Sequence, residues 1–209
     1  MIESNEAKKI FADLQNGLPM SDSEFDAIYP FEIQKVSARH WTSVEVARRA
    51  VQLLEVGSNT PVLDVGSGVG KFCIVGALVT PGFFVGIERR THLVEFSRRI
   101  VEKWGLNRIT FIEGELGIVD WKVFKAIYLF NPFVENLYAP EDRIDQIMDH
   151  SRQRYIAYVR LTQQKLNEAE KGTKVVTYHG FGGDFPPSYE MKAREPWGED
   201  FLVLWVKEE

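Results

Sequence analysis

The chain has 209 residues, of which 44% are hydrophobic and 26% are charged, and its formal net charge is −5 at pH 7. A chain of this size and composition is typical of one globular domain with a full hydrophobic core and a small appendage. The net negative charge excludes a general electrostatic attraction to nucleic acid or anionic lipid. A small molecule or a protein side chain is therefore a more favourable partner than a nucleic acid, and the oligomeric state stays open.

Cysteine content, histidine spacing and hydropathy narrow the class of protein further. The single Cys73 excludes a disulfide framework. The four histidines have no metal-ligand spacing, and one cysteine cannot complete the usual zinc sites, so no metal is expected. The N-terminal stretch M-I-E-S-N-E-A-K-K-I lacks the apolar core of a signal peptide, and no apolar run reaches membrane-spanning length. These features predict a soluble, cytoplasmic protein with no membrane partner.

Residues 1–40 are predicted to form a helical extension ahead of a main domain over residues 41–209. Ser21 and Glu24 have the spacing of a capping box for a short helix, which Pro30 ends. Because the extension is amphipathic, it must pack on something: it either covers the core or forms a lid over a bound ligand. The first helix presents one apolar face, made by Ala7, Ile10, Phe11 and Leu14.

A second helix start follows the extension directly. Thr42 and Glu45 have the spacing of a capping box, and Trp41 and Val46 have the spacing of a hydrophobic staple. The apolar positions then recur at helical spacing until Gly57. This pattern predicts a helix that starts at Thr42 and stops at Gly57.

The organising stretch of the chain is residues 61–72, P-V-L-D-V-G-S-G-V-G-K-F. Its first part is a short apolar run that reads as a strand buried on both faces. Gly66, Gly68 and Gly70 follow at once, and they allow positive φ and a close approach of the backbone to a ligand. Lys71–Val79 is nearly all apolar, as is typical of a helix packed against a parallel sheet. A strand, a glycine turn and a helix N-terminus together predict a cofactor loop.

The spacing of the glycines indicates which cofactor the loop binds. The dinucleotide fingerprint is G-x-G-x-x-G, whereas this loop reads G-x-G-x-G, with Lys71 in place of the third glycine. Asp64 stands two residues before Gly66, where a carboxylate would repel a pyrophosphate and attract a cation. The stretch D-V-G-S-G-V-G resembles the first motif of class I S-adenosylmethionine-dependent methyltransferases, whose ligand carries a sulfonium and an ammonium group. By this resemblance the cofactor-binding residues of the loop are Asp64, Gly66, Ser67, Gly68 and Gly70.

The alternation of strands and helices indicates an α/β fold, a parallel sheet with helices on both faces. Resemblance to the family adds a Rossmann-like, seven-stranded, mostly parallel sheet whose last strand is antiparallel, over roughly residues 42–207. The implied cofactor is S-adenosylmethionine, which leaves as S-adenosylhomocysteine. Two alternatives stay open, an NAD-dependent oxidoreductase and a non-catalytic nucleoside-binding module.

Two acidic positions follow the next predicted strands. Glu88 ends the strand at residues 83–87, where an acid in nucleoside-binding α/β folds accepts hydrogen bonds from ribose hydroxyls. The alternative is a surface carboxylate that pairs with a neighbouring arginine. After a helix at residues 91–104 and a strand at 109–112, the resemblance implies an acid that contacts the adenine amino group. Glu115, with Leu116 beside it, is preferred for that position over Glu113.

A fourth strand, residues 124–130, leads into Asn131, Pro132 and Phe133, which we expect on the same sheet edge as the glycine loop. The segment resembles the [N/D]-P-P-[Y/F] motif of amino-group methyltransferases, although only one proline is present. There the asparagine side chain and the adjacent carbonyl hold the target N–H groups. The resemblance implies that these three residues are the catalytic residues and that Asn131 also contacts the cofactor. It further implies that the methyl acceptor is a nitrogen atom. An Asn-Pro pair is also a common turn signal.

The remainder of the chain supplies secondary structure and a few candidate side chains. Residues 142–169 read as one long helix or as two with a break near Ser151, followed by strands at 174–179, 190–194 and 201–207. His40 and His179 could each reach the methyl edge and accept a proton, although a lone histidine is more often structural. Of the aromatic residues that could line an acceptor pocket, two of three are expected to be core: Trp41, Tyr178 and Phe181.

Overall fold

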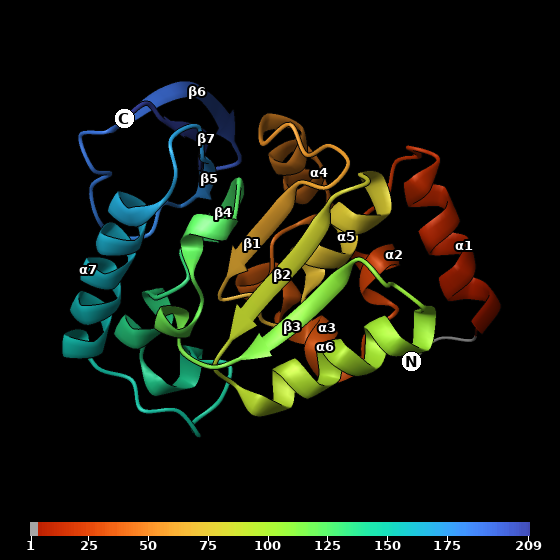
Figure 1. The fold of residues 1–209 in the computed structure, drawn as a ribbon. Helices are drawn as coiled ribbons and strands as arrows, with labels where there is room; N and C mark the ends of the chain where they lie inside the picture. Colours follow the sequence, from red (N-terminus) through yellow and green to blue (C-terminus); the bar gives the residue numbers. More distant parts are fainter. Residues whose placement is uncertain (1–3) are drawn as a thin grey trace.

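The computed structural model describes residues 4–209, so the first three residues of the predicted extension lie outside the described residues. Seven strands form one sheet in the order β3-β2-β1-β4-β5-β7-β6 (Figure 1). The strands are β1 Pro61–Val65, β2 Phe83–Glu88, β3 Ile109–Glu113, β4 Ala126–Phe130, β5 Lys174–Tyr178, β6 Tyr189–Trp197 and β7 Asp200–Lys207. Pairs among β1 to β5 are parallel, whereas β7 is antiparallel to β5 and β6. The predicted α/β sheet with its antiparallel last strand is confirmed.

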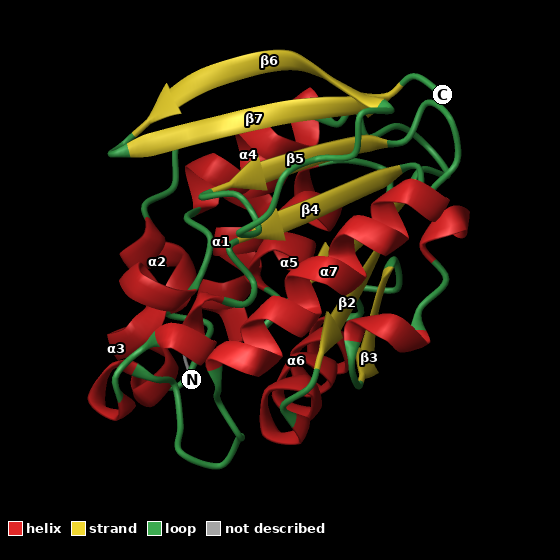
Figure 2. Cartoon of the chain, turned by 90° about the vertical axis from the view of Figure 1, so that its left-hand side faces the viewer, coloured by secondary structure: helices red, strands yellow, loops and turns green. Residues whose placement is uncertain are grey.

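The central strand β1 is buried on both faces of the sheet. Val62 belongs to one core cluster, whereas Leu63 and Val65 belong to another, because successive strand side chains point to opposite faces. On the first face lie α4 Val44–Leu53, α5 Lys71–Val79 and α6 Thr91–Trp104. On the second lie α7 Arg152–Glu168 and the 3-10 turns η1 Leu116–Ile118 and η2 Trp121–Val123, with α7 in front in Figure 2. Helices therefore cover both faces, as predicted.

The strand register brings the predicted site segments to one edge of the sheet. Val65 pairs with Ile87 of β2 and with Leu129 of β4. Glu88 in turn pairs with Glu113 at the end of β3. The loops after β1, β2, β3 and β4 consequently leave the sheet side by side, which is where open parallel sheets bind their ligands.

The N-terminal extension forms three helices, α1 Ser4–Gln15, α2 Asp22–Asp26 and α3 Phe31–His40. The predicted capping box is present: the Ser21 hydroxyl accepts from the Glu24 amide, and the Glu24 carboxylate accepts from the Ser21 amide. The helix α3 was not predicted. The four apolar residues of α1 are buried in the same core cluster as α4 and α5.

Lys71, the first residue of α5, anchors the extension. Its side chain is only 2% exposed, and its Nζ lies 2.7 Å from carboxylate oxygens of both Asp22 and Asp26. The same Nζ donates to Ser37 Oγ at 3.3 Å. The residue that replaces the third glycine of the dinucleotide pattern thus holds α2 and α3 against the cofactor-loop helix.

The start of α4 differs by one residue from its prediction. Ser43 is the N-cap, and its Oγ accepts from the Val46 amide at 3.2 Å, so the capping box predicted at Thr42 is wrong. The reason lies in the core, where the Thr42 hydroxyl makes a 3.0 Å hydrogen bond with the buried hydroxyl of Tyr128. The helix also ends at Leu53, before the predicted stop at Gly57.

The helix predicted before residue 151 is wrong, whereas the break at Ser151 is confirmed. Residues 143–150 are irregular, and the Asp145 carboxylate accepts from the Ile147 amide at 2.9 Å, a local turn that competes with a helix. Ile147 is 78% exposed, whereas Ile144 packs partly against the core, so the apolar positions of this segment do not form one buried helical face. The helix α7 begins after Ser151, whose Oγ accepts from the Arg154 amide.

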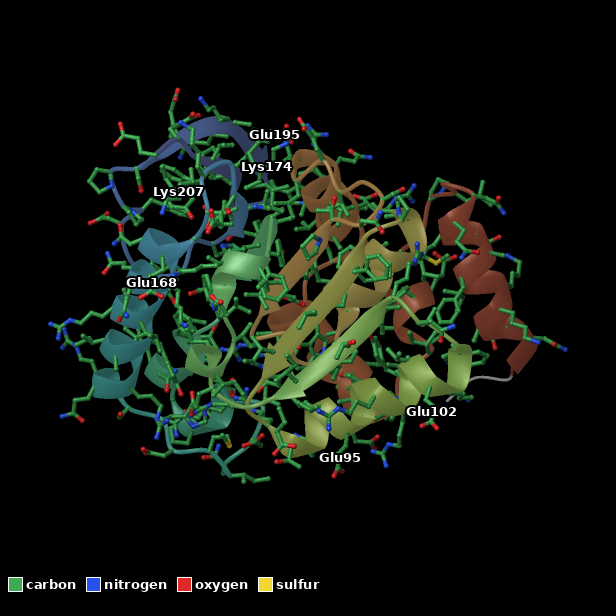
Figure 3. The ribbon with its side chains drawn as sticks, viewed as in Figure 1. Glu95, Glu102, Glu168, Lys174, Glu195 and Lys207 are labelled. Atoms are coloured by element: carbon green, nitrogen blue, oxygen red, sulfur yellow. The ribbon has the colours of Figure 1, made fainter. Side chains whose placement is uncertain are left out.

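Contacts from the last strands fix the helices around the sheet. Lys207, at the end of β7, is 5% exposed and donates to the carbonyls of Leu166 and Asn167 at 3.1 and 2.5 Å (Figure 3). A cation at the C-terminal end of α7 also complements the helix dipole. On the other face, Arg49 of α4 donates to the Glu195 carboxylate of β6 at 2.5 Å.

Candidate active site

The glycine loop after β1 requires glycine at its second and third glycine positions. Gly66, Gly68 and Gly70 have φ values of +76°, +54° and +78°. A Cβ at Gly68 would lie 2.3 Å from the Trp41 ring, and one at Gly70 would lie 2.2 Å from the Phe111 ring. Gly70 is also the N-cap of α5. The loop is therefore held between the extension and the strand β3.

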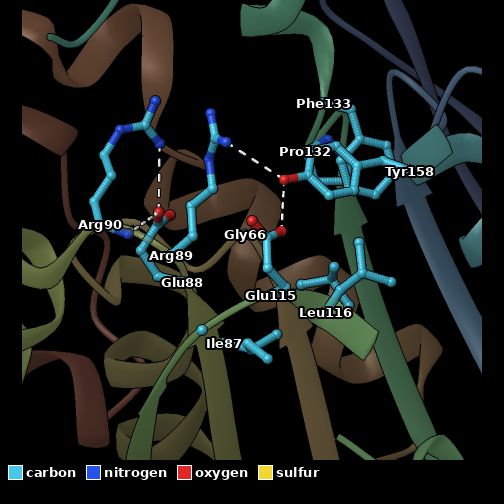
Figure 4. A pocket seen from close by; sticks show the side chains of 12 residues that line it. Gly66, Ile87, Glu88, Arg89, Arg90, Glu115, Leu116, Pro132, Phe133 and Tyr158 are labelled. Atoms are coloured by element: carbon cyan, nitrogen blue, oxygen red, sulfur yellow. Dashed lines mark hydrogen bonds and ion pairs between the residues drawn. The ribbon is translucent and has the colours of Figure 1, made fainter. Parts of the chain in front are cut away.

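Glu88 connects this loop to the end of β2. The side chain is 5% exposed, its Oε2 accepts from the Gly68 amide at 3.2 Å, and its Oε1 accepts from the Arg90 amide at 2.9 Å. The Arg90 guanidinium lies 3.4 Å from the same carboxylate (Figure 4). Glu88 pairs with a neighbouring arginine, as one of the two sequence interpretations expects, but it is buried beside a cavity and not at the surface. A carboxylate can accept about four hydrogen bonds, so capacity remains for a ligand.

A narrow cavity of about 50 Å³ opens where β1, β2, β3 and β4 end. Glu88 and Glu115 supply its carboxylates, and Ile87, Leu116 and Phe133 supply apolar walls (Figure 4). The structure thus brings together Gly66, Glu88, Glu115, Leu116, Pro132 and Phe133 among the predicted residues.

The structure also separates the two acids that follow β3. Glu115 lines the narrow cavity, whereas the competing Glu113 accepts from the Thr91 hydroxyl at 2.7 Å. Tyr158 of α7 lines the same cavity, and its hydroxyl donates to Glu115 Oε2 at 2.5 Å. Its ring stacks on Phe133 with a centroid distance of 5.2 Å. No local sequence signal marks Tyr158, because only the packing of α7 brings it to the cavity.

A wide cavity of about 340 Å³ adjoins the narrow one. Gly66, Glu88 and Pro132 line both cavities, so the two meet at the glycine loop. The wide cavity is bordered by residues from the extension and from the ends of β4 and β5, namely His40, Trp41, Asn131, Tyr138, Tyr178 and His179.

The three aromatic candidates divide as expected. Trp41 and Phe181, which are 8% and 1% exposed, belong to the core, whereas Tyr178 is only partly buried. The expectation that two of the three are core is therefore confirmed, although Trp41 also lines the wide cavity together with Tyr178. The chain turns after Tyr178, and this turn carries Phe181 under α7 and away from the cavity.

Asn131 and His179 stand at matching places on neighbouring strands. Phe130 pairs with Tyr178, and each of the next residues has a positive φ, +36° for Asn131 and +59° for His179. The backbone N–H of Asn131 donates to the Gly180 carbonyl at 3.0 Å, and this hydrogen bond joins the two turns. Such backbone conformations are costly for residues other than glycine and cluster at functional sites.

The two histidines proposed as proton acceptors both line the wide cavity. His179 Nδ1 lies 2.5 Å from Asp200 Oδ2, so a carboxylate orients this imidazole. Burial lowers the pKa of His40 below its ordinary value, which favours the neutral imidazole. Each histidine is therefore placed where it could accept a proton from a ligand in the cavity.

Arg90 is a buried cation between the two cavities that the sequence did not single out. Its guanidinium faces the carboxylates of Glu88, Glu135 and Asp145, at 3.4 Å from Glu88 and 3.2 Å from Asp145. Glu135 also accepts from the Ile144 amide. Arg90 thereby ties the irregular segment after β4 to the acid at the end of β2.

Asp64 of β1 and Ser67 of the glycine loop both line a third, smaller cavity. Asp64 is 4% exposed, and its Oδ2 accepts from the Cys73 thiol at 3.4 Å. Burial raises the pKa of Asp64 to about 7. Gly68 and Gly70 line none of these three cavities. Their role is in the conformation of the loop, where both have a positive φ.

Residues 4–209 contain no group of three histidine, cysteine, aspartate or glutamate side chains placed to hold a metal ion. Within the same residues, none of the helices combines the length and the apolar character needed to cross a membrane.

Comparisons with known proteins give a family and a fold. Residues 57–179 match the family model described as "Methyltransferase domain". No curated protein sequence matches the chain. An RNA methyltransferase from Salinibacter ruber, solved with S-adenosyl-L-homocysteine, has a TM-score of 0.58 at 21% identity, covering 79% of this chain and 92% of its own. A methyltransferase from Geobacter sulfurreducens has a TM-score of 0.61 at 15% identity, covering 97% and 96%. A mutant of MtNAS, solved with S-adenosylmethionine, has a TM-score of 0.59 at 14% identity, covering 98% and 73%.

Proposed function

Because this chain belongs to the class I S-adenosylmethionine-dependent methyltransferase family, we propose that it transfers the methyl group to an amine nitrogen held in the wide cavity. The observation that carries the proposal is the junction of the two cavities at Gly66, Glu88 and Pro132. A donor in the narrow cavity and an acceptor in the wide one would meet at this point. The family match favours this reading over an NAD-dependent oxidoreductase.

The narrow cavity would hold the adenosine part of the cofactor. Glu88 would accept the ribose hydroxyls, Glu115 would accept the adenine amino group, and Leu116 would pack on the base. These roles follow the resemblance, and the lining of the narrow cavity supports them. Gly66, with Ser67, Gly68 and Gly70, would bring the loop backbone to the methionine part, with the Asp64 charge beneath it.

The wide cavity has the chemistry of a site for an amine. Its charged lining is balanced, with two carboxylates against two guanidinium groups, so the aromatic faces of Trp41 and Tyr178 are the groups that would attract a cation. Asn131 would hold the acceptor N–H groups, with Pro132 and Phe133 fixing its position.

An ammonium acceptor would first give a proton to His40 or His179, which line the same cavity. The freed nitrogen lone pair would then form the new bond to carbon as the carbon–sulfur bond breaks and its electron pair stays on sulfur, a step that depends on alignment.

Titration calorimetry tests the donor first. Micromolar binding of S-adenosylmethionine and S-adenosylhomocysteine is expected, with none for NAD, and the opposite preference would overturn the cofactor assignment. A screen of amine, amide, hydroxyl and carboxyl acceptors with methyl-labelled S-adenosylmethionine then tests the acceptor. Turnover only with oxygen acceptors would contradict the amine proposal. Binding without any turnover would favour a non-catalytic nucleoside-binding module.

A further inference from the structure

The hydroxyl of Tyr158 lies at the centre of a polar network beside the narrow cavity. Its Oη lies 2.5 Å from Glu115 Oε2 and 3.4 Å from Arg89 Nη1 (Figure 4). It also lies 3.1 Å from Arg154 Nη1. Glu115 follows β3, Arg89 follows β2, and Arg154 lies one turn earlier in α7. One phenol therefore joins three segments that are far apart in the sequence.

The direction of each hydrogen bond follows from the chemistry of the groups. Burial, together with the contact to Glu115, raises the pKa of Tyr158, so the phenol keeps its proton at neutral pH. The arginines can only donate, and the carboxylate of Glu115 can only accept. The Tyr158 hydroxyl consequently donates its single proton to Glu115 and accepts from the arginines.

Glu115 needs such a partner in order to point in one direction. Its side chain is 47% exposed and follows Gly114, whose φ is +145°. Tyr158, by contrast, is 9% exposed, stacks on Phe133, and lies on a helix whose C-terminal end is fixed by Lys207. A rigid donor thus holds Oε2 of this carboxylate at 2.5 Å, whereas Oε1 has a longer contact of 3.4 Å to the guanidinium of Arg154, a flexible side chain that is 34% exposed and fixes the carboxylate less well.

We propose that Tyr158 determines the base specificity of the cofactor site by holding Glu115 so that its carboxylate meets the 6-amino group of adenine. This inference rests on the proposed function. A 6-amino group donates to the carboxylate, whereas the carbonyl of a 6-oxo purine would place two acceptors face to face. A site built to accept an N–H rejects a ligand that lacks it, because the polar group of the site is then left unpaired.

The test compares two ligands on the wild type and on Tyr158→Phe. The ligands are S-adenosylhomocysteine and its 6-oxo analogue S-inosylhomocysteine, with both dissociation constants measured by calorimetry. The wild type is expected to prefer the adenine ligand by about a hundredfold or more, the scale of a lost hydrogen bond to a charged group. In Tyr158→Phe the affinity for S-adenosylhomocysteine falls about tenfold and the preference falls by a similar factor, since a less firmly held carboxylate still attracts the amino group.

Two further variants separate orientation from packing. Tyr155→Phe removes a hydroxyl from the same helix, and Tyr155 lines neither the narrow nor the wide cavity, so both affinities should stay as in the wild type. In a Glu115→Ala background, adding Tyr158→Phe should change neither affinity by more than about twofold, because the partner through which Tyr158 acts is gone.

Each outcome decides between the proposals. Failure of the wild type to bind S-adenosylhomocysteine would remove the proposed function, and the inference with it. Normal binding by the wild type with no base preference, or an unchanged preference in Tyr158→Phe, overturns the inference and leaves the proposed function standing. Because phenylalanine keeps the ring that stacks on Phe133, an equal loss of affinity for both ligands would show that the Tyr158 hydroxyl supports the cavity without distinguishing the bases, which also overturns the inference.

Discussion

At the scale of single residues, Glu88 serves both the glycine loop and the cavities. We expect Glu88→Gln to weaken S-adenosylhomocysteine binding by roughly ten- to a hundredfold, because a hydrogen bond to a charged group contributes about 1.5 to 3 kcal/mol. Glutamine keeps the shape of the side chain beside Arg90, whereas alanine would leave that buried cation without one of its partners. Calorimetry and a melting curve are the measurements. Normal affinity with a collapsed melting temperature would make Glu88 a structural residue.

Asn131 combines an unusual backbone with a side chain at the wide cavity. Its φ of +36° is tolerated by asparagine and glycine, but costs other residues roughly 1 to 2 kcal/mol. Asn131→Gly therefore removes the amide without backbone strain, and Asn131→Ala adds the strain. Both variants should retain cofactor affinity and lose methyl transfer by about a hundredfold, the effect of removing one positioned polar group. Full activity in Asn131→Gly would place the acceptor clamp elsewhere.

The sequence predicted those site residues whose position depends on local chain geometry. Glu88 and Glu115 follow strands, and strand ends can be read from a short apolar run. A pair between Glu88 and a neighbouring arginine was one of the two sequence interpretations. The contact of Tyr158 with Glu115 and that of Arg90 with Glu135 could not be predicted, because the placement of α7 and of the segment after β4 decides them. A tyrosine on an amphipathic helix has no signal that separates a cavity wall from an ordinary core position.

At the scale of elements, the extension depends on a buried ion pair with the start of α5. Lys71→Met would leave Asp22 and Asp26 without their cation, and breaking a buried pair costs about 3 to 5 kcal/mol. We expect urea denaturation to show a loss of this size. The matched control is Lys9→Met, whose partner is Asp13 and whose side chain is 76% exposed, so its loss of stability should be far smaller than that of Lys71→Met. Equal losses in the two variants would contradict the anchoring role.

The same anchoring limits how the extension could move as a lid. The helix α3 carries His40 into the wide cavity, whereas α1 packs in the core beside α5. Hydrogen exchange with S-adenosylhomocysteine should therefore show added protection in α3 and none in α1. Unchanged protection throughout the extension would leave only the covering role.

Element boundaries were predictable where a glycine flanks a helix with a clear apolar pattern, as Gly70 does before α5 and Gly105 does after α6. The bounds of α5 and α6 match the predicted ones, and Gly105 ends α6 in the left-handed conformation. In residues 143–150 the apolar period had no capping residue to support it, and Asp145 instead turns the chain and faces Arg90. Tertiary pairing with a buried arginine thus overrode a helical pattern that periodicity alone suggested.

At the scale of the whole molecule, an acidic residue, Asp64, lies at the centre of the sheet. Asp64 lies on β1 between β2 and β4, and burial raises its pKa to about 7. An aspartate in the unfolded chain has a pKa of about 3.9. Between these two values the folded protein binds more protons than the unfolded chain, so the free energy of unfolding falls as pH rises.

This linkage gives a prediction for Asp64→Asn, which cannot ionise. The stabilising effect of the neutral Asp64 carboxyl is fully present below about pH 4 and is lost as pH rises through about 7, at about 1.4 kcal/mol per pKa unit. The variant should therefore match the wild type near pH 4 and exceed it by about 4 kcal/mol near pH 8, in urea denaturation of the cofactor-free protein. Burial also lowers the pKa values of His40 and His150, so these two residues make the free energy of unfolding rise with pH. Because the wild type and the variant share both histidines, this contribution cancels in the difference between the two proteins. A difference that does not change with pH would show that the Asp64 carboxyl ionises in the folded protein as it does in the unfolded chain.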